Sequence, residues 1–269
     1  MESENPSAGA GRRVAIVTGG AVRVGRAITL RLARDGYRVV VHHFGSEAAA
    51  RAVMAEIEAA GGSAEAVRLD LTAPGAPGRL VEEVARRAGR LDLLVNSAAL
   101  FVADDAPLGD LARMKVLNAD APAALLDAAA PHLEATRGAV VSIADVAGFV
   151  PFRGRRAYSA TKKSVLALTA RRALELAPRG VRVNAVCPGA VLFPDWYPAE
   201  LKARVLAGVP LGRMGAPGDV ADAVAYLAGA AFVTGQVLSV DGGRLLALLQ
   251  SGAEADADLE RSADARDVN

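Results

Sequence analysis

The 269-residue chain has few of the residue types that form metal cages or disulfide-bonded folds. It contains one cysteine, Cys187, so an internal disulfide is excluded. Its three histidines, His42, His43 and His132, show no metal-ligand spacing, and we expect no bound metal. A lone cysteine, which we interpret as a small buried residue, agrees with the reducing cytoplasm as the compartment.

Long apolar runs and a strong charge bias are absent as well. No window approaches about 20 uninterrupted apolar residues, and the polar segment 1–11 has no apolar core of a signal peptide. The formal net charge is +1, and the basic residues form no cluster. These features argue against membrane insertion, export and nucleic-acid binding, and they favour a small neutral or anionic substrate.

The composition supports one sizeable core, since 52% of the residues are hydrophobic. We expect a flexible segment 1–11, one folded domain over 12–250 and a tail over 251–269. The tail has no apolar stripe, which predicts disorder. Its acidic residues are Glu254, Asp256, Asp258, Glu260, Asp264 and Asp267.

Short β-branched runs alternate with longer alanine-rich stretches of helical pattern, which indicates βαβ units. The prediction is an α/β, single-domain, doubly wound (Rossmann) fold with a seven-stranded parallel sheet and helices on both faces. The expected strands are Val14–Val17, Val39–Val41, Ala64–Leu69, Leu91–Val95, Ala139–Ile143, Val181–Val186 and Val237–Val240. The expected helices are Val24–Arg34, Glu47–Ala60, Gly78–Ala88, Ala121–Leu133, Tyr158–Leu176 and Pro217–Ala228.

A glycine-rich turn lies between the first strand and the first helix. It runs from Thr18 and Gly19 through Arg23 and Val24 to Gly25. Glycines let the backbone approach a pyrophosphate closely, and a helix start offers free N–H groups and a partial positive charge. This turn is predicted to bind the phosphates of a dinucleotide.

The end of the second strand lacks the acidic residue that would accept the ribose hydroxyls of NAD. Ser46, at the start of the next helix, is placed to donate to a 2′-phosphate, although it also suits a plain helix cap. Arg23 supplies positive charge. We therefore predict NADP(H) as the cofactor, and we place His42 and His43 near its adenosine pocket.

Tyr158 and Lys162 stand four residues apart at the start of a helical stretch, so they share one helix face. A nearby ammonium favours tyrosinate and is expected to lower the pKa of the phenol from about 10. Tyr158 is thus a candidate proton donor in a hydride-transfer reaction.

From 12 to 246 the chain resembles the short-chain dehydrogenase/reductase family. The matching motifs are the 18–25 loop, the Asn96-Ser97-Ala98-Ala99 turn, Tyr158 with Lys162, Pro188-Gly189 and Asp241-Gly242-Gly243. The resemblance implies a catalytic tetrad with Asn118, Tyr158, Lys162 and a residue before the tyrosine. It also implies a homotetramer, and cofactor contacts by Asp70, Leu71, Asn96, Ala98, Pro188 and Gly189.

Two departures from the general family pattern narrow the resemblance. Asp145 stands thirteen positions before Tyr158, where most members carry serine, and Arg23 replaces the middle glycine of the loop. Both features resemble the pteridine reductases and the bacterial dihydromonapterin or dihydrofolate reductases of this family. Phe101 stands where those enzymes stack an aromatic ring on the pterin, whereas Ala99, Leu100 and Gly45 depart from their pattern.

A pterin substrate gives these residues a chemical purpose. Its ring nitrogens must be protonated as hydride arrives, and a carboxyl group such as Asp145 suits that transfer, together with Tyr158. Arg23 would bind both pyrophosphate and pterin, and Phe101 would sandwich the flat ring. Asp145 alternatively caps a strand end, Phe101 packs a loop, and Arg23 binds phosphates alone. Trp196 and Tyr197 belong to a mobile substrate loop or to surface packing.

Three functions therefore compete. The leading hypothesis is NADPH-dependent reduction of a pterin of the dihydropterin or dihydrofolate type. The alternative within the family is a carbonyl reductase that acts on a 3-oxoacyl thioester or another ketone, for which a serine is expected at position 145. A catalytically silent NADP(H)-binding regulator is the third, and the joint presence of Asn118, Tyr158 and Lys162 argues against it.

Overall fold

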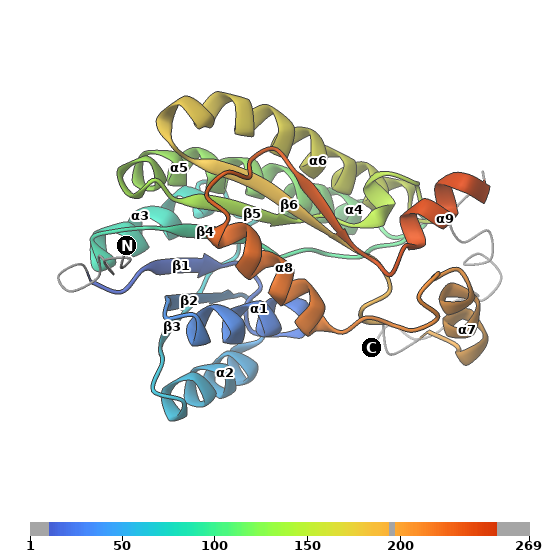
Figure 1. The fold of residues 1–269 in the computed structure, drawn as a ribbon, viewed down its shortest axis with the longest axis horizontal. Coiled ribbons are helices and arrows are strands. Elements are labelled where there is room, and N and C mark those ends of the chain that lie inside the picture. The colour runs from blue at the N-terminus through green and yellow to red at the C-terminus, as the bar shows by residue number, and fades with distance from the viewer. Residues whose placement is uncertain (1–10, 194–196, 252–269) are drawn as a thin grey trace, which may run out of the picture.

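The computed structural model describes residues 11–193 and 197–251, which form one α/β domain (Figure 1). The predictions for residues 1–10, for Trp196 and for the acidic tail beyond 251 fall outside the described residues. Within the described part, no helix is both long and apolar enough to cross a membrane.

A seven-stranded, all-parallel sheet with strand order β3-β2-β1-β4-β5-β6-β7 forms the centre of the domain. All seven predicted strands are confirmed, with ends that shift by up to two residues. Their bounds are β1 Val14–Val17, β2 Arg38–His43, β3 Ser63–Arg68, β4 Leu93–Asn96, β5 Ala139–Ile143, β6 Arg182–Pro188 and β7 Val237–Val240.

Helices cover both faces of this sheet, as predicted. On one face α1 (Arg23–Arg34) packs against α8 (Pro217–Gly229), and α2 (Glu47–Ala59) lies beside them under β2 and β3 (Figure 1). On the other face lie α3 (Ala76–Ala88), α5 (Ala121–Thr136) and α6 (Arg156–Leu176).

The strand sequences explain these two layers. In β2, Val39 and Val41 pack into the core with α1, α2 and α8, whereas Val40 packs into the opposite core with α3, α5 and α6. Successive side chains of a strand point to opposite faces, so a strand that is buried on both faces must be apolar throughout. This is why the central strands are continuous apolar runs.

Several short helices were not predicted from the sequence. They are α4 (Leu108–Lys115), which continues through a π-helical turn (Val116–Asp120), α7 (Ala199–Ala207) and α9 (Arg244–Ser251). Two 3₁₀ turns, Val146–Gly148 and Ala177–Arg179, were missed as well. Segments of eight or nine residues carry too few turns for a helical period to stand out, and tertiary contacts decide their conformation.

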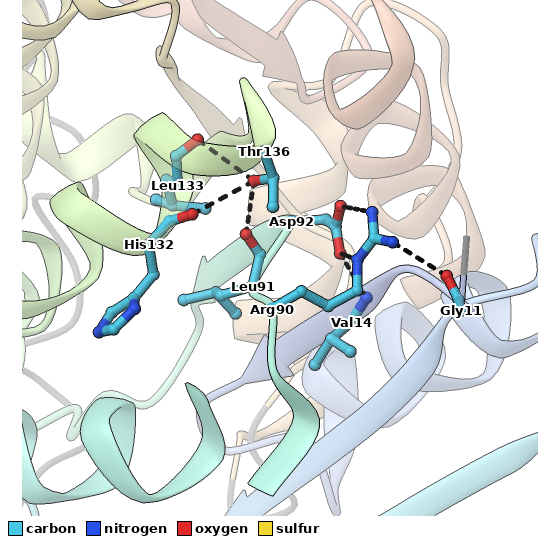
Figure 2. Close-up of polar contacts among 8 residues, drawn as sticks. All are labelled: Gly11, Val14, Arg90, Leu91, Asp92, His132, Leu133 and Thr136. Carbon is cyan, nitrogen blue, oxygen red and sulfur yellow. Dashed lines mark hydrogen bonds and ion pairs between the residues drawn. The ribbon is translucent and has the colours of Figure 1, made fainter. Parts of the chain in front are cut away.

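The amino ends of the strands are held by a buried carboxylate (Figure 2). Asp92 accepts a hydrogen bond from the Val14 amide at 2.8 Å and two from Arg90, at 2.9 and 2.7 Å. Arg90 also donates to the Gly11 carbonyl at 3.0 Å. Asp92 therefore connects the start of β1 to the start of β4.

The end of α5 joins the same edge. Thr136 donates from its hydroxyl to the Leu91 carbonyl at 2.6 Å, and His132 lies one turn earlier on this helix (Figure 2). This edge is opposite to the carboxyl ends of the strands. The strand order reverses between β1 and β4, and in such sheets the ligand crevice lies at the carboxyl ends of that switch point.

Candidate active site

A cavity of about 640 Å³ opens at the carboxyl ends of the strands, as the switch point predicts. Most of the predicted site residues line it: Gly19, Arg23, Val24, Gly25, Ser46, Asp70, Leu71, Ala98, Phe101, Asp145, Tyr158, Lys162, Pro188 and Gly189. Thr18, Asn96 and Asn118 are not among the lining residues, although they too were predicted as site residues.

The glycine turn has the shape of a phosphate cradle. Gly19 adopts the left-handed region at φ +64°. A Cβ atom on Gly25 would lie 2.1 Å from the Gly19 carbonyl oxygen, so only glycine lets α1 approach the turn this closely. The turn and the first turn of α1 line the cavity, and the residues therefore fit a dinucleotide pyrophosphate.

Thr18 supports this turn from behind. Its hydroxyl oxygen accepts hydrogen bonds from the amides of Ser97 at 2.9 Å and Ala98 at 3.1 Å. Thr18 is thus a positioning residue that joins the end of β1 to the turn after β4. Its predicted direct contact with the cofactor stays a prediction.

Arg23 lies on the exposed rim of the cavity with its backbone in the left-handed region, at φ +53°. Non-glycine residues adopt this region at a cost of about 1 kcal/mol or more. Glycine adopts this left-handed conformation without that cost, which explains why it is common at this loop position. An arginine at the same position is unfavourable for stability unless its side chain contributes to binding.

The end of the cavity around Phe44 and Ser46 is where we expect the adenosine and its 2′-phosphate. Ser46 is the N-cap residue of α2, but its side chain makes no capping hydrogen bond, which leaves the hydroxyl for a ligand. Arg68 at the end of β3 donates to the Phe44 carbonyl at 3.3 Å. The Arg68 guanidinium supplies positive charge beside Gly45, a position at which this sequence departs from the pteridine reductases and carries no charged side chain. Asp70 pairs with Arg113 of α4 at 2.9 Å.

The catalytic end brings Asp145, Tyr158 and Lys162 together. The Tyr158 hydroxyl donates to Asp145 Oδ2 at 2.8 Å, and the Ala147 amide donates to Asp145 Oδ1 at 2.9 Å. Lys162 donates from Nζ to the Ile143 carbonyl at 3.0 Å. Asp145 therefore caps the turn after β5 and also contacts the tyrosine, and its role in proton transfer stays a prediction.

Burial and mutual contact set the protonation of these groups. Burial raises the pKa of Asp145, although the Ala147 amide, Lys162 and Tyr158 oppose the shift. Burial and the Asp145 carboxylate raise the pKa of Tyr158 well above its usual value. Burial also lowers the pKa of Lys162.

The expectation that Lys162 lowers the pKa of Tyr158 is therefore wrong for this structure. The phenol hydroxyl donates a hydrogen bond to the adjacent Asp145 carboxylate, an arrangement that stabilises the protonated phenol. The sequence showed the Tyr158–Lys162 spacing, but it could not show that Asp145 lies closer to the phenol oxygen.

Asn118 and Asn96 make structural contacts beside the site, Asn118 with the loop at Leu100 and Asn96 with the neighbouring strand β5. Asn118 lies in the π-helical turn, accepts from the Leu100 amide at 2.8 Å and donates to the Leu100 carbonyl at 2.8 Å. Asn96 donates to Ser142 at 3.3 Å, whereas its buried Oδ1 has no partner among the described residues. Both positions suit positioning residues, and a direct catalytic or cofactor contact by either stays a prediction.

Phe101 forms part of the cavity wall next to Tyr158. Its ring meets the Tyr158 ring edge-on, with centroids 4.7 Å apart, and the Arg155 guanidinium lies 4.6 Å from its centroid. Side chains thus fix this ring from two directions. It is a packed loop residue and a cavity-lining aromatic at the same time.

Two cavity residues with charged side chains were not predicted from the sequence. Arg113 lies on α4, and Arg244 lies at the start of α9 and donates to the Val205 carbonyl of α7 at 2.6 Å. Both belong to helices that were not predicted. An arginine directly after a double glycine, at the head of an apolar stretch, was the available signal for Arg244.

Comparison with known proteins identifies the family. Residues 20–244 match the family model described as Enoyl-(Acyl carrier protein) reductase. The chain belongs to the short-chain dehydrogenase/reductase family. A 3-oxoacyl-[acyl-carrier-protein] reductase of Staphylococcus aureus is 37% identical over 242 residues, which is 85% of this chain and 96% of that protein.

Two further members of the family are similar over the same region. A 2,5-dichloro-2,5-cyclohexadiene-1,4-diol dehydrogenase of Sphingobium indicum is 33% identical, covering 86% of this chain and 95% of that protein. A crystal structure of a putative NAD(P)-dependent gluconate 5-dehydrogenase from Beutenbergia cavernae, with bound NADP, superposes with a TM-score of 0.81. It is 36% identical and covers 87% of this chain and 97% of that one. These short-chain dehydrogenase/reductase relatives confirm the predicted fold class.

Proposed function

We propose that this protein is an NADPH-dependent reductase that transfers hydride to a pterin of the dihydropterin or dihydrofolate type. The observation that carries the proposal is the 2.8 Å hydrogen bond between Tyr158 and a partly buried carboxyl group, Asp145, on the cavity wall. A carboxyl group there is a proton source suited to a ring nitrogen.

The cofactor is NADP(H), which supplies the hydride. The related structure with bound NADP supports it, and so does the absence of an acidic residue at the end of β2. Ser46 and Arg23 line the cavity and provide a hydroxyl and a cation for the 2′-phosphate, and Arg68 at the end of β3 adds a second cation beside Phe44.

Asp145 has the properties of a general acid. Its raised pKa favours the carboxylic acid at a higher pH than for an exposed aspartate, and the fixed Oδ1 keeps the group oriented. Tyr158 is protonated in the resting site, and its hydrogen bond to Asp145 Oδ2 places the phenol to return a proton to the carboxylate after Asp145 has given its own proton to the substrate. In this arrangement Lys162 orients the end of β5 through the Ile143 carbonyl.

The cavity wall suits a flat heteroaromatic ring. Phe101 offers an aromatic surface beside Tyr158, and Arg23 offers a planar guanidinium on the rim. Stacking on an aromatic ring and bidentate hydrogen bonding from arginine are the usual means of binding such a ring.

Reduction of a ketone is the second candidate. The comparisons support ketone reduction better than pterin reduction, because the relatives named above include a 3-oxoacyl-[acyl-carrier-protein] reductase. Tyr158 and Lys162 provide the proton donor and the cation that this chemistry needs. This alternative gives Asp145 no part in the chemistry and leaves it only the structural contact with the Ala147 amide.

Steady-state NADPH oxidation across a substrate panel separates the candidates. The panel contains dihydrobiopterin, dihydromonapterin, dihydrofolate and a 3-oxoacyl thioester. We expect kcat/KM for at least one pterin to exceed that for the thioester by about two orders of magnitude. A preference for the thioester would replace pterin reduction by ketone reduction.

A further inference from the structure

The glycine turn is held by a histidine that the proposed chemistry does not use. His42, the fifth residue of β2, is 3% exposed. Its Nδ1 accepts a hydrogen bond from the Gly19 amide at 3.3 Å, and its Nε2 lies 2.9 Å from the Leu69 carbonyl oxygen. The His42 backbone carbonyl also accepts from the Gly20 amide at 3.0 Å.

These partners define one tautomer of the ring. A carbonyl oxygen only accepts, so Nε2 must carry the hydrogen, and a backbone amide only donates, so Nδ1 must be bare. His42 is therefore neutral in this arrangement. If the ring were protonated, the Nδ1–H of His42 would face the amide N–H of Gly19, and two hydrogen-bond donors would oppose each other.

Gly19 is the point on which the cradle depends. It takes the left-handed conformation, and α1 approaches its carbonyl so closely that Gly25 can carry no side chain. Fixing the Gly19 amide therefore fixes the turn relative to α1. Through Leu69 the same ring joins the turn to the end of β3, on the adenosine side of the cavity.

We propose that neutral His42 is a positioning residue for NADP(H), which holds the Gly19 amide and thereby preforms the phosphate cradle. The inference rests on the cofactor assignment and not on the choice of substrate. Because protonation removes the acceptor at Nδ1, cofactor affinity should fall in acid through this residue.

The surroundings of His42 agree with a neutral ring. Burial lowers its pKa, and the neighbouring His43 of β2 lowers it further, against the Leu69 carbonyl and Asp70 beyond β3, which raise it. Asp70 is itself paired with Arg113 of α4. Protonation therefore begins below the usual histidine pKa of about 6.5.

Two substitutions separate the two hydrogen bonds of the ring. His42→Asn places an amide oxygen near the position of Nδ1 and keeps an acceptor for Gly19, whereas His42→Gln places its amide near Nε2 and keeps only the Leu69 contact. We expect NADP+ affinity at pH 7.5, measured by calorimetry, to stay within about 3-fold in His42→Asn and to fall about 10-fold in His42→Gln.

The pH profile supplies the readout that simple packing would not move. Between pH 7.5 and 5.5 the NADP+ affinity of the wild-type protein should fall more steeply than that of His42→Asn, because only the wild-type side chain can be protonated in this range. The titration of the 2′-phosphate affects both proteins equally and does not contribute to the difference. His132→Asn, at the far edge of the sheet (Figure 2), is the matched control and should keep the wild-type profile.

Equal affinities of the Asn and Gln variants, or parallel pH profiles in wild type and His42→Asn, would overturn the proposal. Nitrogen NMR of the wild-type protein tests it without a variant. A hydrogen on Nδ1 of His42 at pH 7.5 would contradict it directly. Failure of the wild-type protein to bind NADP+ would overturn the cofactor assignment itself.

Discussion

Asp145 uses one carboxylate oxygen for structure and the other for Tyr158, and burial makes its charge unfavourable. A carboxyl group whose pKa is higher in the folded than in the unfolded protein adds stability at low pH. That stability is lost as the pH rises through the folded-state pKa. At neutral pH the ionised Asp145 side chain therefore lowers the free energy of unfolding, as is common for functional groups.

The isosteric variant Asp145→Asn tests this cost. Its amide oxygen can still accept from the Ala147 amide, but the side chain is uncharged at every pH. We expect the free energy of unfolding at pH 7.5 to rise by about 1 kcal/mol. Denaturant titrations should show the gain shrinking as the pH falls toward about 4, the unfolded-state pKa of aspartate. A variant less stable than wild type at pH 7.5 would contradict the assigned pKa direction.

Arg23 is the second residue whose cost and role can be separated. In Arg23→Gly the relief of the left-handed backbone offsets the added entropy of the unfolded chain, so the free energy of unfolding should change by less than about 1 kcal/mol. NADPH affinity should nevertheless fall about 5-fold or more, since a cation near the phosphates is lost. Arg23→Lys keeps the charge and serves as the control in the same fluorescence titration. Unchanged NADPH affinity in the glycine variant would remove Arg23 from the cofactor site.

At the scale of elements, the long strands and helices could be predicted because their patterns repeat over several turns or are apolar throughout. The helices α4, α7 and α9 could not, since each is short and depends on what it packs against. The consequence for the site is specific. Arg113 and Arg244 stayed unassigned because the helices that bring them to the cavity were not predicted.

The edge formed by the amino ends of the strands yields a prediction about stability alone. Asp92→Ala removes the partner of Arg90 and of the Val14 amide, so we expect a loss of about 2–4 kcal/mol in the free energy of unfolding. The pair of Asp120 with Lys115 is exposed, and Asp120→Ala should cost less than about 1 kcal/mol. Both variants should keep the wild-type KM for NADPH, because neither residue lines the cavity. Equal losses in the two variants would refute a structural role for Asp92.

For the whole molecule, we propose that four copies assemble, as the family resemblance implies. Several large apolar side chains are exposed in the described part of the chain, among them Leu174 of α6, Phe232 before β7, and Leu246 and Leu249 of α9. Exposed apolar groups of this size are typical of surfaces that contact another protein. Light scattering should give four times the chain mass of 27.6 kDa, and a monomer at micromolar concentration would contradict the assembly.

The overall site could be predicted because motif residues at the carboxyl ends of parallel strands meet at one edge. The sequence could not show which of these side chains contact one another within the site. It placed Tyr158 with Lys162, whereas the structure pairs the phenol with Asp145 and lets Lys162 hold a carbonyl. The direction of the tyrosine pKa depends on that difference.

The most direct test of the account is the substrate preference of Asp145→Ser. NADPH oxidation would be measured with a dihydropterin and with a 3-oxoacyl thioester, and Tyr158→Phe would serve as a reference that impairs both reactions. If Asp145 delivers the proton, the serine variant should lose on the order of 100-fold in kcat for the dihydropterin, while turnover of the thioester is retained or rises. Undiminished dihydropterin turnover in Asp145→Ser would contradict the role of Asp145 and, with it, the proposed function.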